Sequence, residues 1–179
     1  MKSGIFSKLQ KSTTEFPRSF WILVGSSFID RLGGALIFPF LSLYIANRFQ
    51  VGLTEVGLLL AVWSISGLTG SIIGGAMTDR FGRRFMLIFG LIFSAGTALL
   101  MGFAKNLAMF FWVLAFSGLL SDVGGPAQSA MVADLLNEKQ RPEGYGILRV
   151  SSNLAMVIGP AIGGMLAGIS YMLLFILDA

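Results

Sequence analysis

Charged and polar side chains interrupt the apolar stretches of this sequence, and their types could do chemistry there. Asp30 and Arg31 lie near the middle of the first stretch, and Asp122 lies near the middle of the fourth. Arg149 and Asn153 are one helical turn apart in the fifth. A charge at the centre of a bilayer costs roughly 2.5–3.5 kcal/mol on insertion scales. These groups must therefore be paired, neutralised or hydrated.

Two interpretations of these charges remain open. In the functional one, Asp30 and Asp122 face a polar cavity near the bilayer midplane, where a carboxyl gains and loses a proton. Asp30 is the first candidate for that role and Asp122 the second. In the structural one, Arg31 pairs with either acid and only joins helices. Arg149 either reaches water at the membrane edge or meets an anionic substrate group, and Asn153 can bond to either.

Aromatic side chains in the same stretches could give such a cavity a lipophilic surface. The alternative is that they pack against lipid or neighbouring helices, as most aromatic residues of membrane helices do. The candidates are Phe38, Phe40, Tyr44, Trp63 and Phe116.

The composition requires long membrane-spanning helices to position these residues. Of the 179 residues, 55% are hydrophobic and 12% are charged, whereas a soluble domain carries about 25% charged residues. A span needs roughly 20 apolar residues, so the segment from Tyr171 to Ala179 is too short, and the chain looks cut inside a sixth helix. The five complete spans are predicted at Ser19–Ala46, Leu53–Thr78, Phe85–Lys105, Met109–Asp134 and Gly144–Gly168.

Prolines and basic residues refine this prediction. Pro39, Pro126 and Pro160 lie inside predicted spans, where they can bend or interrupt a helix. Lys and Arg residues concentrate on one side of the spans, which the positive-inside rule assigns to the cytoplasm together with an N-terminal tail at 1–18. A multi-pass protein of the plasma membrane is expected. The nine residues on that side are Lys2, Lys8, Lys11, Arg18, Arg80, Arg83, Arg84, Lys139 and Arg141, against Arg48 and Lys105 on the other.

A block of three apolar segments recurs. The sequence Gly70–Gly75 returns in similar form as Gly159–Gly164, and the segments before and after it also match loosely in the same order. A unit with an odd number of spans enters the bilayer from opposite sides on its two appearances, which is the inverted-repeat pattern of secondary transporters. The repeat predicts units at 19–105 and 106–179, the second incomplete. The alternative is chance similarity between glycine-rich helices.

The turn after the second span carries the strongest local motif. Gly75 and Asp79 share one helix face because they are four residues apart, and Gly75 would let a neighbouring helix come close. Gly82 can adopt the positive φ that ends the helix. Asp79 is an anion suited to a facing helix N-terminus or to an arginine. The alternative is a basic loop that only fixes orientation.

These motifs resemble those of the major facilitator superfamily. The turn, formed by Gly75, Asp79, Arg80, Gly82, Arg83 and Arg84, is similar to the loop signature of that family. The segment with Gly159, Pro160, Gly163 and Gly164 resembles its antiporter motif, with Ala155 where fuller forms carry another glycine. The resemblance implies an all-α membrane fold: the N-terminal six-helix half of a twelve-helix transporter similar to drug:proton antiporters.

The resemblance also implies a gating mechanism. Asp79 would cap a helix of the second half, and Arg83 would pair with Asp134 at the cytoplasmic end of the fourth span. Together they would form a latch that stabilises the outward-facing state. Family antiporters often carry an arginine one turn before a glycine of the fourth span; if Gly118 is that glycine, Leu114 occupies the position.

The expected function is proton-coupled efflux of small amphipathic molecules by alternating access. The alternatives are symport or uniport of a nutrient and, in another class, a non-transporting fragment or an assembly or regulatory membrane protein. Expected partners are the lipid bilayer, a small-molecule substrate, protons and the missing C-terminal half, without nucleic acid or cofactor. An enzyme is not expected, because the sequence has no Walker-type glycine loop and neither histidine nor cysteine.

Overall fold

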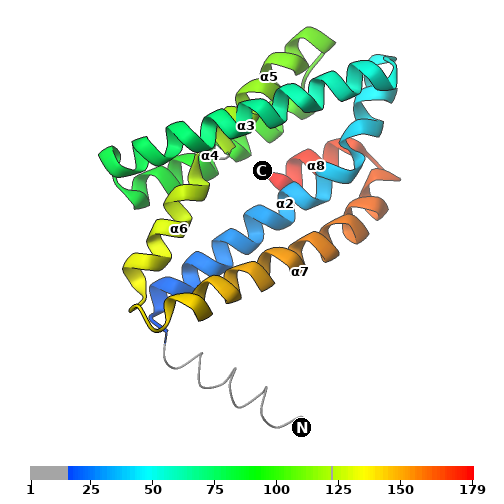
Figure 1. Ribbon diagram of the computed structural model, residues 1–179. Coiled ribbons are helices and arrows are strands. Elements are labelled where there is room, and N and C mark those ends of the chain that lie inside the picture. Colours follow the sequence, from blue (N-terminus) through cyan, green and yellow to red (C-terminus); the bar gives the residue numbers. More distant parts are fainter. Residues whose placement is uncertain (1–15, 122) are drawn as a thin grey trace.

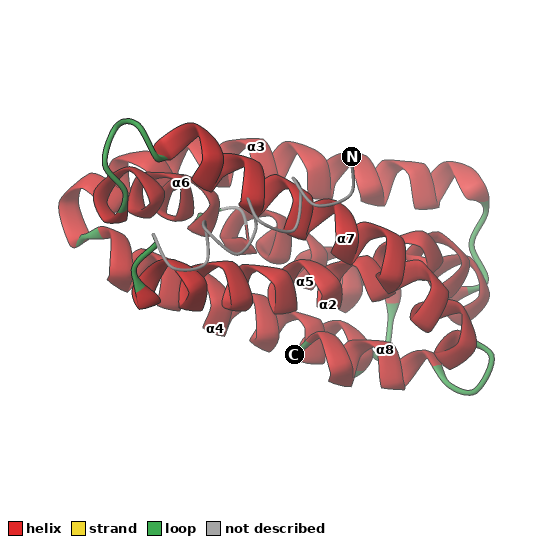
Figure 2. Cartoon of the chain, turned by 90° about the horizontal axis from the view of Figure 1, so that it is seen from below, coloured by secondary structure: helices red, strands yellow, loops and turns green. Residues whose placement is uncertain are grey.

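The computed structural model describes residues 16–121 and 123–179, so Asp122 and most of the predicted tail lie outside the described residues. The described chain is made of helices joined by short loops, and the long helices run side by side (Figures 1 and 2). The helices are α2 (Arg18–Phe49), α3 (Leu53–Phe81), α4 (Arg83–Gly102), α5 (Leu107–Ser121), α6 (Gly124–Leu135), α7 (Arg141–Ala167) and α8 (Tyr171–Asp178).

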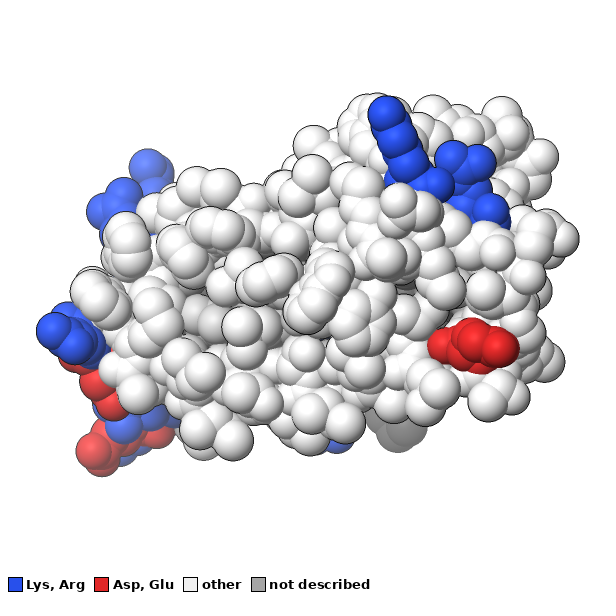
Figure 3. Space-filling view, turned by 90° about the horizontal axis from the view of Figure 1, so that it is seen from above, with Lys and Arg blue, Asp and Glu red and all other residues white. Residues whose placement is uncertain are grey.

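The helices have the length and apolarity of membrane spans, as predicted. Within the described ranges, α2, α3, α4, α7 and the combined length of α5 and α6 give 5 segments long enough to cross a bilayer. On the face shown in Figure 3, charged side chains gather at the two ends of the molecule, and the middle is almost free of them. An uncharged middle between charged ends is the surface expected of a protein that crosses a hydrocarbon core.

Two helical segments, on either side of the undescribed Asp122, cover the fourth predicted span. Its first part, α5, ends at Ser121, and α6 begins at Gly124. Pro126 is the third residue of α6, where its missing N–H is tolerated because the first turn of a helix has no internal acceptor for it. By contrast, α2 and α7 continue through Pro39 and Pro160.

Helices from the first half of the sequence pack mainly against helices from the second half. The strongest packing joins α2 to α7 and α3 to α5, and Figure 1 shows α2 and α7 lying along each other. In the predicted units, α2 is the first helix of unit 19–105 and packs on α7, the second helix of unit 106–179. Likewise α5, which begins unit 106–179, packs on α3, the second helix of unit 19–105. The division into two units stays a prediction, but this reciprocal packing is the arrangement that an inverted repeat requires.

Glycines make the reciprocal packing possible. Small residues let membrane helices approach closely, and a Cβ added at Gly74 would lie 2.7 Å from the Cα atom of Val123. A Cβ at Gly159 would lie 2.5 Å from that of Ala35. The two similar sequences at Gly70–Gly75 and Gly159–Gly164 therefore hold equivalent contacts. The contact pairs are Gly70 with Leu119, Gly74 with Val123, Gly159 with Ala35, and Gly163 with Leu36.

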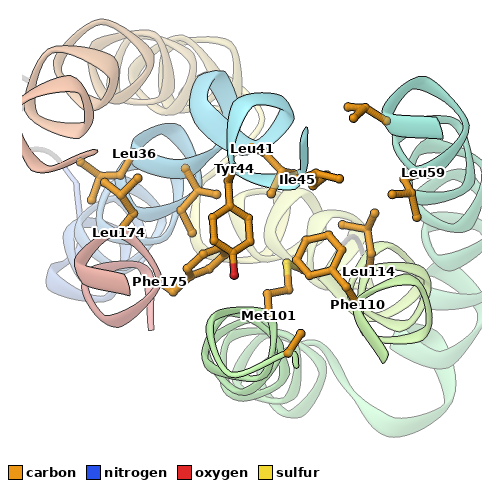
Figure 4. Packing of buried hydrophobic residues seen from close by; sticks show 13 residues of the cluster. Leu36, Leu41, Tyr44, Ile45, Leu59, Met101, Phe110, Leu114, Leu174 and Phe175 are labelled. Carbon is orange, nitrogen blue, oxygen red and sulfur yellow. The ribbon is translucent and has the colours of Figure 1, made fainter. Parts of the chain in front are cut away.

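The largest apolar cluster lies at the end of the bundle opposite the basic turn, around Tyr44. The ring centroid of Tyr44 is 5.0 Å from that of Phe175, 5.9 Å from that of Phe110 and 5.5 Å from that of Tyr171. Figure 4 shows side chains of α2, α4, α5 and α8 converging around it. These contacts fix the start of α8 against α2 and so determine where the last residues of α8 lie.

Candidate functional site

A cavity of about 630 Å³ lies among the helices. Its lining comes from all seven helices of the described residues, so its shape depends on the reciprocal packing described above. The lining is mixed, with apolar side chains interspersed with polar ones, as in sites that bind small organic molecules. The polar and charged residues that line it are Ser26, Ser27, Asp30, Arg31, Ser64, Ser94, Ser117, Gln128 and Asp178.

Two of the charged residues singled out from the sequence meet at this cavity. Asp30 is half-buried and Arg31 is exposed, and both belong to the part of α2 that lines it. Asp122, the second candidate for proton coupling, is not described. Whether Arg31 neutralises an acid or contacts a ligand stays open, but its position in the cavity wall gives it access to both.

Asp178 is a cavity residue that the sequence reasoning missed. It is the last residue of α8, and a Cβ at Gly33 would lie 2.5 Å from its Oδ1 atom and 3.0 Å from its Cα. Because α8 packs this tightly on α2, Asp178 lies in the wall of the same cavity as Asp30. The signal available in the sequence was an acid within an apolar stretch, the same signal that singled out Asp30.

A hydrogen bond crosses the cavity wall between α2 and α6. Gln128 donates from Nε2 to the hydroxyl oxygen of Ser27 over 2.7 Å, and Ser27 is buried. This bond joins helices that otherwise share few contacts. Since both side chains line the cavity, an occupant with hydrogen-bonding groups can compete for either of them.

Two helix-interior prolines each leave one backbone carbonyl without its helical donor. A proline has no N–H to donate to the carbonyl four residues earlier. Pro39 therefore leaves the Ala35 carbonyl without its helical donor, and Pro160 does the same for the carbonyl of Met156. Ala35 and Met156 both line the cavity.

The five aromatic candidates lie in different surroundings and do not form one surface. Phe38 and Trp63 line the cavity, with their ring centroids 5.6 Å apart. Tyr44 is instead buried in the cluster of Figure 4. Phe40 packs against Gly163, and Phe116 is exposed and is not part of the cavity lining.

Arg149 and Asn153 are exposed on α7 and do not line the cavity. They share a helix face with Met156, which does line it, because the three residues follow the i, i+4, i+7 spacing of one face. The face thus leads from the cavity at Met156 toward the N-terminal end of α7. The structure does not bring this pair together with Asp30.

The turn between α3 and α4 has the backbone geometry that the sequence predicted. Gly82 adopts φ +91°, a left-handed conformation that favours glycine, and it ends α3 and begins α4. No helix of the described chain approaches Gly75. A Cβ there would meet nothing within 4 Å in the described chain, and the close approach occurs at Gly74 instead. Gly74 therefore lets the segment around Val123 approach α3 closely.

An ion pair connects this turn with the end of α6. Arg83 contacts Asp134 and also donates from a terminal guanidinium nitrogen to the Ala130 carbonyl over 3.2 Å. The pair borders a second cavity of about 470 Å³, which Asp79 and Arg84 also line. Arg80 and Arg84 are exposed, and no ion pair is recorded for them within the described ranges. Arg83 is thus the basic residue of the turn that ties α4 to α6.

We expect Arg83→Gln to loosen the contact between α4 and α6 at this end of the bundle. Both side chains of the pair are partly exposed, at 38% and 56%, and exposed pairs contribute about 0.2–1 kcal/mol, or up to about five-fold in an open population. Because the sequence lacks cysteine, a Met131→Cys reporter can be labelled without background. Its labelling should be faster by up to about five-fold with Arg83→Gln. Arg84→Gln is the control, and equal effects of the two substitutions would contradict the prediction.

Comparisons with known proteins agree with these observations. The family model of the Major Facilitator Superfamily matches residues 23–179. The chain is 34% identical over 158 residues to Multidrug resistance protein 1 of Bacillus subtilis, a match that covers 88% of this chain and 40% of that protein. It is 32% identical over 149 residues to a Na(+), Li(+), K(+)/H(+) antiporter of Planococcus maritimus, covering 80% of this chain and 34% of the relative.

A solved structure confirms the fold. The peptide transporter POT, crystallised as a mutant with sulfate, aligns with a TM-score of 0.81 at 20% identity. The alignment covers 90% of this chain and 35% of that one. At this identity the likeness speaks for the fold alone. In all of these matches the chain spans less than half the length of the relative.

Proposed function

The chain belongs to the Major Facilitator Superfamily, a family of multi-pass membrane transporters rather than enzymes, and from that premise we propose a specific activity for it. It forms the N-terminal part of a secondary transporter that exports small amphipathic molecules in exchange for protons. The two predicted units, 19–105 and 106–179, would rock together against a C-terminal half of the same protein, with the N-terminus in the cytoplasm. The observation that carries the proposal is the cavity with Asp30 in its wall.

The lining of the cavity supports an amphipathic substrate. Phe38 and Trp63 offer adjacent aromatic rings, and Gln128 and Ser27 offer hydrogen-bonding groups that can exchange partners. A molecule with an apolar body and one polar or cationic group fits such a lining. In this proposal Asp30 binds either that group or a proton, so that loading one releases the other and couples their movements.

The ion pair of Arg83 with Asp134 supplies the gate of the proposal. It would close the cytoplasmic end while the cavity opens to the outside, and it would separate when the halves rock. Asp79 is exposed beside the pair and lines the same small cavity. It would meet a helix N-terminus of the C-terminal half, where an anion is stabilised by the helix dipole.

A second candidate, exchange of monovalent inorganic cations for protons, is favoured by one observation. Asp30 and Asp178 both line the same cavity, and two carboxylates there could share a small cation. A relative from Planococcus maritimus is named as an antiporter of this kind. The aromatic part of the lining favours the organic substrate, and the two candidates differ in what should release protons.

The experiment that tests the proposal measures proton movement in everted membrane vesicles that contain the full-length protein. After acidification of the interior, a lipophilic organic cation such as ethidium should release protons, and a pH-sensitive acridine dye should recover its fluorescence. Release by sodium or potassium salts alone would select the second candidate. Proton movement that follows a sugar or amino acid would indicate nutrient symport. Lack of response to all of them would support a chain without transport activity.

A further inference from the structure

Four phenylalanine rings form a continuous strip at the turn between α3 and α4. Phe81 ends α3, and Phe85, Phe89 and Phe93 follow along α4 at intervals of one helical turn. The ring centroids are 6.3 Å apart from Phe81 to Phe85, 6.0 Å from Phe85 to Phe89, and 4.4 Å from Phe89 to Phe93. We call these four residues the phenyl strip.

Most of the strip is exposed, and only Phe89 is partly buried, where it packs against the cluster around Met86. Phe81 is 53% exposed and Phe85 is 56% exposed, and Phe93 remains exposed as well. The opposite side of α4 is buried, with Met86 packed in a cluster with Val123 of the preceding loop and Ala127 of α6. The phenyl strip therefore lies on the outer surface of α4.

Two arginines stand at one end of the strip. The guanidinium of Arg80 lies 5.6 Å from the ring centroid of Phe81, a distance at which a cation is attracted to an aromatic face. Arg84 is exposed one residue before Phe85. Arg83 is held by Asp134 and does not join them. With Asp79 the only acid of the turn, the two arginines leave an excess of positive charge there.

The strip has the depth of one bilayer leaflet. Eight residues separate Phe85 from Phe93, which is about 12 Å along a helix, and one leaflet contributes about 15 Å of hydrocarbon. The exposed positions between them are large, with Ile88 and Ile92 beside the rings. Membrane helices approach one another at small residues, so this surface suits a flexible acyl chain better than another helix.

We propose that the phenyl strip, with Arg80 and Arg84, binds an anionic phospholipid of the cytoplasmic leaflet. The headgroup phosphate contacts the two guanidinium groups, and one acyl chain lies along the rings of Phe85, Phe89 and Phe93. Anionic lipids of that leaflet attract basic residues near the membrane surface. The site is independent of the proposed transport activity, because none of its residues lines the central cavity.

Tryptophan quenching by brominated lipids tests the site in the full-length protein. Native Trp21, Trp63 and Trp112 are replaced by phenylalanine, and Phe85→Trp supplies a reporter in vesicles of brominated phosphatidylglycerol and unbrominated phosphatidylcholine. We expect the reporter to prefer phosphatidylglycerol by about five-fold for each contacting arginine. Arg80→Gln combined with Arg84→Gln should remove the preference. Arg48→Gln, in the last turn of α2 at the opposite end of the bundle, should leave it unchanged.

A protein with Trp112 as its sole tryptophan is the matched control. Trp112 is 62% exposed on α5, away from the phenyl strip, and should show little preference for either lipid. If replacing all three native tryptophans prevents folding, Phe85→Trp is made in the protein that keeps them. Subtracting the quenching of the protein without Phe85→Trp then gives the quenching of the reporter in each lipid. Equal preferences at the two positions, or a preference that survives the arginine substitutions, would overturn the proposal. Protection of the reporter from all brominated lipid would show that protein covers the strip, and would overturn it as well.

Discussion

Replacement of Asp30 by asparagine is expected to abolish substrate-driven proton movement in the full-length protein while leaving membrane insertion intact. Asparagine keeps the size and the hydrogen-bonding capacity of the side chain but cannot bind and release a proton. Asp30 lines the cavity, so its loss removes an ionisable group from the proposed binding site. The measurement is recovery of acridine-dye fluorescence in everted vesicles, with protein levels matched by immunoblot.

Two further variants make the result specific to the site. Glu55→Gln changes an exposed acid in the first turn of α3, which does not line the cavity, and should leave proton movement unchanged. Asp178→Asn should weaken coupling, because Asp178 is a second carboxyl in the lining of the cavity that holds Asp30. Binding of ethidium, followed by its fluorescence, should weaken in Asp30→Asn, because Asp30 is proposed to bind the cationic group as well as the proton. Undiminished proton movement in that variant would remove Asp30 from the mechanism.

Gly70→Ala is expected to destabilise the helix bundle strongly, although the change adds a single methyl group. The added Cβ would collide with the carbonyl of Leu119, whose carbon atom would be 2.7 Å away. Backbone atoms cannot rotate out of the way, so α3 and α5 must separate along their length. Over-packing of this kind costs about 1–3 kcal/mol, occasionally more. A lowered midpoint of thermal unfolding, followed by size-exclusion chromatography of a fluorescent fusion, would report the loss.

Gly57→Ala on the same helix is the matched control. A Cβ at Gly57 would contact nothing within 4 Å in the described part of the chain, and alanine favours a helix over glycine by about 1 kcal/mol. Its unfolding midpoint should stay the same or rise slightly. Equal shifts in Gly70→Ala and Gly57→Ala would show that the contact with Leu119 does not hold the bundle together.

Features governed by local chemistry could be predicted from the sequence. The spans follow from the length of the apolar runs, because a hydrocarbon core imposes a minimum length on any helix that crosses it. The positive φ of Gly82 follows from its place between two helical segments. The proximity of Arg83 and Asp134 was implied by the resemblance of the turn to a family motif, and the two residues form an ion pair. Its role as a gate stays a prediction.

Features set by the rotation and depth of whole helices could not be predicted. Gly74 and Gly75 lie about 100° apart around a helix, and only the position of Val123 shows that Gly74 carries the close contact. The approach of Asp178 to Asp30 depends on how α8 packs against Gly33, which leaves no pattern within α8 itself. The same holds for Arg149, whose exposure is decided by the face of α7 that packs on α2.

The reciprocal packing of α2 on α7 and α3 on α5 has a consequence for biosynthesis. When the ribosome has delivered only α2, α3 and α4 to the membrane, the glycine faces of α3 have no protein partner and must contact lipid or the insertion machinery. Gly70 and Gly74 can contact Leu119 and Val123 only after the next span has been inserted. Ala35 can contact Gly159 only after the span that follows it. The strongest packing of the first three helices is thus completed only after later spans have been inserted, first between α3 and α5 and then between α2 and α7.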